Sequence, residues 1–485
     1  MIPFADILLQ TANRRNLSIY IVGGFLRDRL LQRASHDLDL VVDLDPRTIG
    51  MELAEATGGT YYELNLEHSA ARVDLFWNDQ FWQVDIGSIR GRNIQEDIRN
   101  RDFTVNAMAL HLEKALPGKG WEHHVLDPFQ GKKDLEKKLL RVVGEDVILD
   151  DPLRIIRGIR FASQLEFELE EQTQLLFQKN RKLLFRISGD RLKMEMGKIL
   201  ENSSVKYIRM MQRLRLLETL FPYLEKLLKD AEAKNGLRGW EHSMQTLYYL
   251  EKLVSELFFT EPWKYGLERY LAEELSTGWQ RVKTLKLAAL FYNIKAAEAS
   301  RSLEKAGADF FLPSKTGGYL FRYSRRLRLK RVERNLLENA ASLYTAPLKL
   351  YLHSSRTSRT LYRFYRNLGR ETPGILLFSL ADYFSLADSP QARKQFNLPP
   401  KEDYRNFVNN LFSRYFIDQE RYVQAASLIT KHELQTFLGL EQGAMVLEIL
   451  EAIAEARAEG KIKTRKEAFE LAEKEYRRRI SGKID

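Results

Sequence analysis

The stretch Ile21–Asp45, IVGGFLRDRLLQRASHDLDLVVDLD, decides the fold of the N-terminal part of the chain. An apolar pair leads into Gly23 and Gly24, the residues that follow are typical of a short helix, and an apolar run begins after His36. The glycines and the change in hydrophobic periodicity predict the order strand, glycine turn, helix, strand.

Two carboxylates, Asp37 and Asp39, stand two residues apart in the second predicted strand. Because strand side chains alternate, both carboxylates point to the same face of the sheet. Neighbouring carboxylates repel each other unless a cation lies between them. Oxygen ligands of this kind suit a divalent ion, and Mg²⁺ is the ion that we expect.

The Gly23–Gly24 turn is the second feature of this stretch. Glycine lets backbone N–H groups approach an anion closely, and Arg27, one turn into the helix, adds a positive charge. Carboxylates that bind a metal beside a turn that binds phosphate are typical of phosphoryl transfer. Each motif alone is common at turns and solvated strand ends, so the prediction depends on their combination.

The order Gly-Gly-x-x-Arg-Asp, short helix, Asp-x-Asp resembles the signature of the DNA polymerase beta-like nucleotidyltransferases. In this form it is similar to class II tRNA nucleotidyltransferases and bacterial poly(A) polymerases. The resemblance implies that Asp37 and Asp39 are catalytic metal ligands. It implies nucleotide binding by the residues of the turn and helix, namely Gly23, Gly24, Arg27 and Asp28.

Such enzymes often place a third carboxylate on a nearby strand, and Asp85 in Trp82–Ile86 is the candidate here. It would hold a second metal or activate the attacking hydroxyl group. The alternative is a surface residue on an edge strand. The segment Ile98–Leu110, IRNRDFTVNAMAL, resembles a further motif of the family, followed by an apolar, helix-like run. The resemblance implies that Arg101 meets the triphosphate and that Asp102 orients the ribose hydroxyl group.

The segment Asp150–Ala162, DDPLRIIRGIRFA, predicts a helix that begins at Pro152. Three arginines recur every third residue and line one side of it, a pattern that is usually a surface with ion pairs. The resemblance implies instead that this helix reads the incoming base. The residues that it assigns are Asp151 and Arg154 for the base, with Arg157 and Arg160 as phosphate or packing support. Ile187–Arg191 resembles the motif that braces this helix.

Length and composition suit a large multidomain protein. The chain has 485 residues, 44% hydrophobic content and no cysteine, which excludes disulfides and thiolate metal sites. We expect a soluble, unexported, cytoplasmic protein, because neither an apolar run of membrane-spanning length nor a leader is evident. The net charge of +10 is compatible with a nucleic-acid partner.

Two basic stretches rich in aromatic residues, Phe321–Arg334 and Ser355–Arg370, suit a surface that neutralises phosphates and stacks bases. The alternative for both is a solvated helix face whose arginine stems cover apolar neighbours.

The predicted fold class is an α+β nucleotidyltransferase head with a small sheet, followed by an all-α body and tail. The predicted domains are the catalytic head (1–145), a helical neck that recognises the base (146–203), a helical body (204–395) and an RNA-binding helical tail (396–485). In the body, Trp240–Thr246 and Leu287–Lys295 resemble the landmarks of an HD-type phosphohydrolase. Tyr292 and Asn293 replace its His-Asp pair, so we expect a scaffold without metal.

The resemblance implies Mg²⁺-dependent, template-independent addition of CCA to the 3′ end of tRNA from CTP and ATP. Pyrophosphate is released. A CC-adding enzyme is a serious alternative, because only Gly87–Asp97 separates the Asp85 strand from the Arg101–Asp102 motif. An A-adding enzyme or a poly(A) polymerase shares the same head. A non-catalytic RNA-binding scaffold would require loss of the paired carboxylates, which are present.

Overall fold

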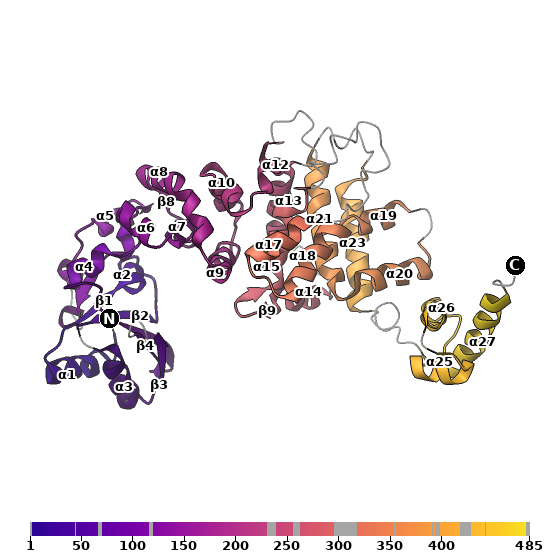
Figure 1. Ribbon diagram of the computed structural model, residues 1–485, viewed down its shortest axis with the longest axis horizontal. Helices are drawn as coiled ribbons and strands as arrows, with labels where there is room; N and C mark the ends of the chain where they lie inside the picture. Colours follow the sequence, from indigo (N-terminus) through magenta and orange to yellow (C-terminus); the bar gives the residue numbers. More distant parts are fainter. Residues whose placement is uncertain are drawn as a thin grey trace. The chain divides into compact units, whose positions relative to one another are not determined.

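The computed structural model divides the chain into two compact units, Met1–Leu220 and Phe221–Asp485 (Figure 1). The structure describes residues 2–43, 45–65, 70–115, 120–229, 239–255, 262–294, 318–353, 356–389, 392, 398–417, 428–441 and 443–481. The four-part domain division within these units stays a prediction.

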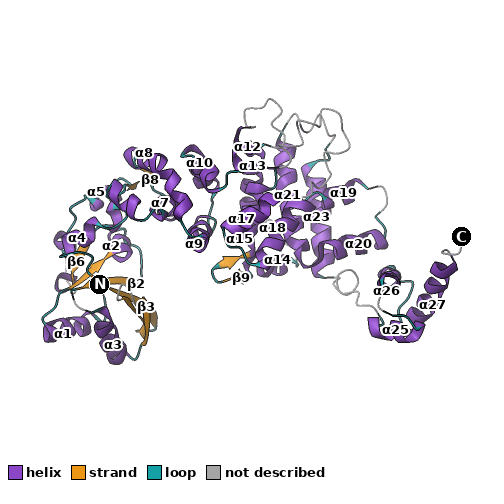
Figure 2. Ribbon diagram, in the orientation of Figure 1, coloured by secondary structure: helices purple, strands orange, loops and turns teal. Residues whose placement is uncertain are grey.

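The first unit is built on a six-stranded sheet with the order β3-β4-β5-β2-β1-β6 (Figure 2). Its strands are β1 Ile19–Val22, β2 Asp37–Val42, β3 Thr60–Asn65, β4 Ala70–Trp77, β5 Gln80–Ser88 and β6 Ala109–His111. Strand β2 runs parallel to β5, and the other neighbours are antiparallel. The predicted strand, glycine turn, helix, strand order is confirmed, with α2 Gly23–Leu30 between β1 and β2.

The two faces of this sheet differ in polarity, as period-2 alternation requires. On β4 and β5 the cross-strand pair Val73 and Val84 is fully buried, whereas the pair Arg72 and Asp85 lies on the opposite face. Helix α3 Pro46–Thr57 packs on β4 and β5, and α1 Ala5–Arg15 packs against α3. The apolar face is thereby covered, and the carboxylates lie on the other.

The rest of the first unit is mostly helical. Its helices are α4 Ile94–Arg99, α5 Gly131–Glu136, α6 Glu145–Asp150, α7 Leu153–Leu165, α8 Glu171–Asn180, α9 Gly189–Ile199, α10 Val205–Arg213 and α11 Leu216–Leu220. Two short strands, β7 Leu139–Leu140 and β8 Glu168–Leu169, pair in parallel. Helix α7 approaches the head closely at Gly158, where a Cβ atom would lie 2.6 Å from the ring of Phe177 and 3.1 Å from that of Phe103.

One local expectation is wrong. The apolar run after Arg101 and Asp102 is not a regular helix: it forms a single 3-10 turn, Thr104–Asn106, and then strand β6. The reason is tertiary, because Ala109 pairs with Val22 of β1 and extends the sheet by one strand.

In the described residues of the second unit, the regular structure is helical except for the small hairpin of β9 Glu274–Ser276 and β10 Trp279–Gln280, which the all-α prediction missed. Gly278, with a φ of +68°, makes its tight turn. The helices are α12 Leu224–Lys229, α13 Trp240–Ser255, α14 Lys264–Ala272, α15 Arg281–Phe291, α17 Gly318–Arg326, α18 Arg331–Leu343, α19 Ala346–Leu352, α20 Ser358–Leu368, α21 Thr372–Asp388, α23 Lys401–Phe416, α25 Lys431–Leu438, α26 Ala444–Ala458 and α27 Arg465–Ser481. No helix among the described residues is long and apolar enough to cross a membrane.

A buried polar network lies where the sequence resembles an HD-type domain. The carboxylate of Asp382 accepts hydrogen bonds from the hydroxyl group of Tyr292 (2.7 Å) and contacts Nε2 of His242 at 2.8 Å. Ser385 contacts Nδ1 of the same histidine, and Thr246 contacts the tyrosine hydroxyl group. The network joins α13, the residue that follows α15, and α21 by hydrogen bonds between side chains. Lys295, the end of the second landmark, lies outside the described residues.

Candidate active site

Three carboxylates lie on the polar face of the sheet, on the parallel pair β2 and β5. Asp39 is level with Asp85, and Asp37 is level with Gln83. The side-chain amide of Gln83 donates a hydrogen bond to Oδ1 of Asp37 at 3.2 Å. The register therefore brings all three predicted catalytic carboxylates to neighbouring positions on one face.

The carboxylates of β2 resist ionisation. Burial, together with the negative charge of Asp37, raises the pKa of Asp39 to about 6, although Arg101 and the backbone N–H of Gly24 oppose the shift. Burial and the charge of Asp85 also raise the pKa of Asp37. A cation bound between the two carboxylates would reduce their mutual repulsion and favour their ionised forms.

Asp39→Asn is expected to stabilise the metal-free protein at pH 8 by roughly 1–3 kcal/mol, because a carboxylate with a folded-state pKa near 6 and an unfolded-state pKa near 3.8 is held ionised at a cost. The wild-type penalty is fully present above pH 6 and is lost as the pH falls towards 4. The gain should therefore shrink over that interval in chemical denaturation curves. The prediction fails if the gain is independent of pH. Mg²⁺ should raise the melting temperature of the wild type more than that of the variant.

The glycine turn meets these carboxylates directly. Gly23 has a φ of +68°, and a Cβ atom on it would lie 2.8 Å from Oδ2 of Asp39 and 3.3 Å from Nη1 of Arg101. The backbone N–H of Gly24 donates to the carboxylate of Asp39. Glycine is required at position 23 for two reasons, its backbone conformation and the space that the carboxylate and the guanidinium occupy.

Arg101 is fixed beside the turn by Asp97, whose carboxylate accepts its Nε–H at 2.8 Å. The other oxygen of Asp97, which is itself buried, accepts the backbone N–H of Arg90 at 3.0 Å. The arginine that the resemblance assigns to the triphosphate thus stands next to Asp39 in a preorganised position.

The third carboxylate has a partner that sequence reasoning did not identify. Both oxygens of Asp85 accept hydrogen bonds from Arg72, at 2.7 and 2.8 Å. The signal was present in the sequence: β4 and β5 are joined by the two-residue turn Asn78–Asp79, with both residues at positive φ, and this turn fixes the register that sets Arg72 opposite Asp85. Any metal contact of Asp85 must share its oxygens with this guanidinium.

Asp102 is buried and paired with the arginine helix. Its Oδ2 lies 2.7 Å from Nη2 of Arg157, and its Oδ1 accepts from the backbone N–H of Phe103 and the side chain of Asn106. Burial raises the pKa of Asp102, but Arg157 and Asn106 outweigh burial and hold the pKa below its ordinary value. The carboxylate therefore stays ionised as the anchor of α7.

Arg27 bridges the head and α7. Its guanidinium pairs with Asp28 at 2.9 and 3.0 Å, donates to the side-chain carbonyl of Asn106 at 2.9 Å and lies 5.5 Å from the centre of the Phe161 ring. The predicted nucleotide-binding residues Arg27 and Asp28 are thus ion-paired with each other.

The predicted base-reading residues lie at the start of α7. The side chain of Asp151 accepts the backbone N–H of Leu153 and, at 2.7 Å, a hydrogen bond from Arg191 of α9. Arg154 donates to the backbone carbonyls of Val147 and Asn100, which leaves three of its five N–H groups for another acceptor. The helix begins at Leu153, one residue after the predicted start, and Pro152 is its N-cap residue.

Helix α9 braces α7, as the motif at Ile187–Arg191 predicted. Besides Arg191, Glu195 lies 3.2 Å from Nε of Arg160, and both side chains are buried. The Arg160 guanidinium also stacks on Phe161 at 4.1 Å. Arg160 is therefore held inside the protein, in agreement with a packing role. Neither Arg191 nor Glu195 was among the predicted site residues, because the contacts form between two separate helices.

The carboxylate oxygens of Asp37 and Asp39 suit a hard divalent cation that also binds the phosphates of a substrate. In the part of the chain that the structure describes, no three Asp, Glu or His side chains converge as a complete ligand set. Mg²⁺ is commonly held by one or two carboxylates together with substrate phosphates and water, so Asp37 and Asp39 would suffice.

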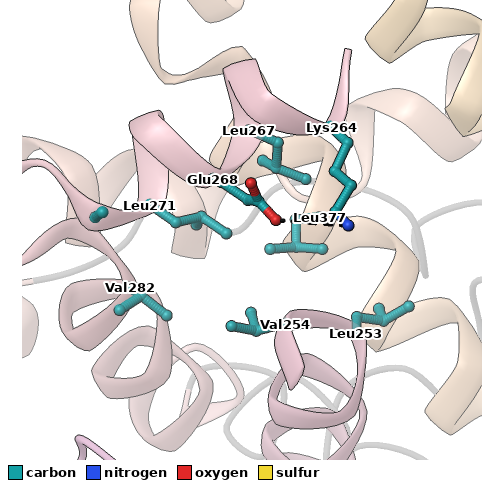
Figure 3. A pocket seen from close by; sticks show the side chains of 9 residues that line it. Leu253, Val254, Lys264, Leu267, Glu268, Leu271, Val282 and Leu377 are labelled. Carbon is teal, nitrogen blue, oxygen red and sulfur yellow. Dashed lines mark ion pairs between the residues drawn. The ribbon is translucent and has the colours of Figure 1, made fainter. Parts of the chain in front are cut away.

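Two cavities lie among the described residues, and neither is lined by Asp37 or Asp39. A polar cavity of about 440 Å³ lies at the carboxyl ends of β2 and β5 and is lined by Val42, Asp43, Asp45, Ser88, Ile89, Gly91 and Arg92. An apolar cavity of about 240 Å³ in the second unit is lined mainly by aliphatic side chains such as Leu253, Leu267 and Leu377 (Figure 3). Its charged residues, Lys264 and Glu268, pair with each other at 3.8 Å. It offers no convergent polar groups for nucleotide chemistry.

The first unit matches known families. Residues 19–141 match the model described as the poly A polymerase head domain. Residues 166–228 match the probable RNA and SrmB-binding site of polymerase A. Residues 19–141 thus resemble a head domain of the kind that the glycine turn and the paired carboxylates predicted.

The chain is also similar to curated nucleotide-adding enzymes over part of its length. The chain is 31% identical over 199 residues to the CC-adding tRNA nucleotidyltransferase of Geobacter sulfurreducens, covering 41% of this chain and 44% of the relative. It is 35% identical over 216 residues to the CCA-adding enzyme of Geobacillus thermodenitrificans, covering 41% and 50%. The matched segments thus span about half the length of these curated relatives.

The fold of the whole chain is that of CCA-adding enzymes. A CCA-adding enzyme in complex with ATP superposes with a TM-score of 0.63 at 22% identity, covering 96% of this chain and 93% of the other. The Thermotoga maritima CCA-adding enzyme complexed with tRNA gives 0.59 at 21% identity, covering 97% and 95%. The predicted fold class is confirmed.

Proposed function

We propose that this chain adds nucleotides to the 3′ end of tRNA without a template, using CTP and ATP, and completes the CCA end. The observation that carries the proposal is the pair Asp37 and Asp39, held on one sheet face beside the Gly23–Gly24 turn and Arg101. The names of the curated relatives supply the substrate class. With tRNA as the substrate, we place the reaction in the cytoplasm.

The proposed mechanism assigns a role to each group. When bound by Asp37 and Asp39, Mg²⁺ would supply charge neutralisation for the triphosphate and activation of the 3′ hydroxyl group. Arg101 and Arg27 would neutralise phosphate charge, and the in-line attack on the α-phosphate would release pyrophosphate. Positioning and electrostatics do most of this work. Asp102, whose oxygens accept from Phe103, Asn106 and Arg157, would orient the ribose through the groups that it holds in place. Asp85 would be the third carboxylate, near the attacking hydroxyl group.

Base choice is proposed to lie at the start of α7. Asp151 can accept and Arg154 can donate hydrogen bonds, so together they can satisfy the polar edge of cytosine or adenine. The support is that the two residues are one turn apart and anchored by Arg191 and by backbone carbonyls, which gives a fixed geometry. Two further arginines of α7 hold the helix in place: Arg157 pairs with Asp102, and Arg160 pairs with Glu195.

Arg154→Ala is expected to lower the preference for CTP and ATP over UTP and GTP by about 10-fold to 100-fold, since one bidentate contact contributes about 1–3 kcal/mol of discrimination. The apparent affinity for triphosphate should change less, because Arg101 and Arg27 are untouched. Single-nucleotide incorporation with each of the four triphosphates measures both quantities. Unchanged selectivity would remove Arg154 from the base-reading role.

A CC-adding enzyme is the second candidate, and one observation favours it. The connection between β5 and α4 is only five residues long, Ile89–Asn93, and has no room for an extended flexible segment. The Geobacter sulfurreducens relative is itself a CC-adding enzyme.

The product is decided by one assay. Transfer RNA that lacks its last three, two or one nucleotides is incubated with the full chain, Mg²⁺ and labelled CTP or ATP, supplied separately and together. Addition of C, C and A supports the proposal, and addition that stops after CC supports the second candidate. Long A tracts on an unrelated RNA would identify a poly(A) polymerase, and no incorporation on any RNA would overturn the proposed function.

A further inference from the structure

The two basic, aromatic stretches of the second unit differ sharply in the structure. In the second stretch, helix α20 faces α26, and its arginines are neutralised there: Arg359 and Arg363 both pair with Glu455, and Arg366 pairs with Glu451. The aromatic rings of α20 are buried. This helix is a packed interface, and it offers neither free charge nor exposed rings to a nucleic acid. Ser355, the first residue of that stretch, lies outside the described residues.

The first stretch has the opposite character. Between Phe321 and Arg334 the sequence has seven cationic side chains and one carboxylate. We define the α17–α18 surface by five of its residues, namely Phe321, Arg322, Arg325, Arg331 and Arg334. Helices α17 and α18, which carry it, are consecutive along the chain (Figure 1).

The single carboxylate of this stretch does not neutralise the surface. Glu333 is fully buried, and it accepts hydrogen bonds from the backbone N–H of Lys330 at 2.7 Å and from the hydroxyl group of Ser276. Among the residues that the structure describes, no carboxylate pairs with Arg322, Arg325 or Arg331, all three of which are exposed. Their charges therefore remain available to an external anion.

An aromatic ring lies among these charges. Phe321 is 45% exposed, and the guanidinium groups of Arg325 and Arg334 lie 5.9 and 5.6 Å from the centre of its ring. Arg322 lies 5.1 Å from the ring of Tyr223. Stacking on rings lowers the freedom of long side chains, so these arginines are partly ordered before a ligand binds.

We propose that the α17–α18 surface binds the phosphate backbone of RNA, with Phe321 exposed to stack against an unpaired base. Exposed cations without a carboxylate partner fit a polyanion, and an exposed ring among guanidinium groups fits a base better than it fits an acidic peptide. This inference rests on the proposed function for its RNA class. It assigns the RNA contact to α17–α18 and excludes α20, whose arginines are already paired.

The test is equilibrium binding of the full chain to fluorescein-labelled tRNA without its CCA end, measured by anisotropy from 50 to 300 mM salt. Arg322→Ala/Arg325→Ala is expected to weaken binding about 10-fold and to lower the slope of log K against log salt by about 1.5, since each lost phosphate contact lowers it by about 0.7 to 0.9. The KM of the variant for tRNA should rise, and its kcat at saturating tRNA should equal that of the wild type.

The matched control is Arg14→Ala/Arg15→Ala, which removes the same charge from α1. Both arginines already pair with Glu52, and α1 lies over α3, which covers the apolar face of the head sheet and not its carboxylate face. The salt slope of this control variant should equal that of the wild type. Phe321→Leu should weaken binding to single-stranded RNA about 5-fold with an unchanged slope.

The outcomes separate the two proposals. If the wild type incorporates CTP but the α17–α18 variants keep wild-type affinity and slope, the surface assignment is overturned and the proposed function stands. If the control lowers the slope as much as the surface variant, the effect is net charge and the assignment is also overturned. If polyglutamate competes with tRNA as well as unlabelled tRNA does, the partner is an acidic chain and not RNA. If the wild type neither binds tRNA nor incorporates nucleotide, the proposed function itself fails.

Discussion

Asp37→Ala will lower nucleotide incorporation by about three orders of magnitude or more and leave tRNA binding within about 2-fold of the wild type. The residue is one of two carboxylates that would hold the metal, and metal ligands contribute to the transition state far more than to RNA affinity. It lies on the polar face of the sheet, with the amide of Gln83 as its hydrogen-bond partner. Single-turnover incorporation and anisotropy, measured on the same preparation, give the two quantities.

A matched variant guards against a trivial loss of fold. Asp43→Ala removes the next acid beyond the end of β2, where its carboxylate accepts the backbone N–H of Ser18 at 3.1 Å. It should retain most of the incorporation rate. Substantial turnover by purified Asp37→Ala would rule out Asp37 as an essential metal ligand.

Arg157→Met will destabilise the protein by about 3–5 kcal/mol, the usual result of leaving a buried carboxylate without its cation. The carboxylate is that of Asp102, and Arg157 is the strongest of the groups that keep its pKa below the ordinary value. A depressed pKa contributes stability above the unfolded-state value near 3.8, and this contribution is lost as the pH falls through the lower folded-state value. In the variant the deficit should be largest at neutral pH and should narrow in acid.

The double variant Asp102→Asn/Arg157→Met isolates the charge. It removes both partners, so it should recover more than half of the stability that Arg157→Met loses, because no unpaired charge stays buried. Urea denaturation at pH 5 and pH 8 measures all three proteins. A deficit in the double variant equal to that of the single variant would show that the arginine acts through packing on Phe161 and not through Asp102.

The sequence predicted the elements around the paired carboxylates well, because their geometry depends on residues that are close together in the chain. The pair Asp37 and Asp39 has its geometry set by strand alternation, and the predicted order of strand, glycine turn, helix and strand follows from local spacing. Contacts between distant segments were out of reach of such signals. Arg157 was assigned to phosphate or packing support, yet it anchors Asp102, 55 residues earlier in the chain.

The same limit explains why the sequence did not distinguish the two basic stretches. Phe321–Arg334 and the α20 stretch look alike in composition, and both were assigned the same alternatives. What separates them is Glu455, a residue 92 positions beyond Arg363, and the inward direction of Glu333. Composition cannot show which charges are already paired, and only the packing of α26 against α20 supplies that information.

The crowding at Gly23 sets a boundary for protein engineering. Because even a methyl group there would press into Oδ2 of Asp39 and would need an unfavourable positive φ, libraries that aim to alter nucleotide choice should leave this position unvaried. Under the proposed function, diversity belongs at the start of α7, because Asp151 and Arg154 make their hydrogen bonds away from the carboxylates of β2.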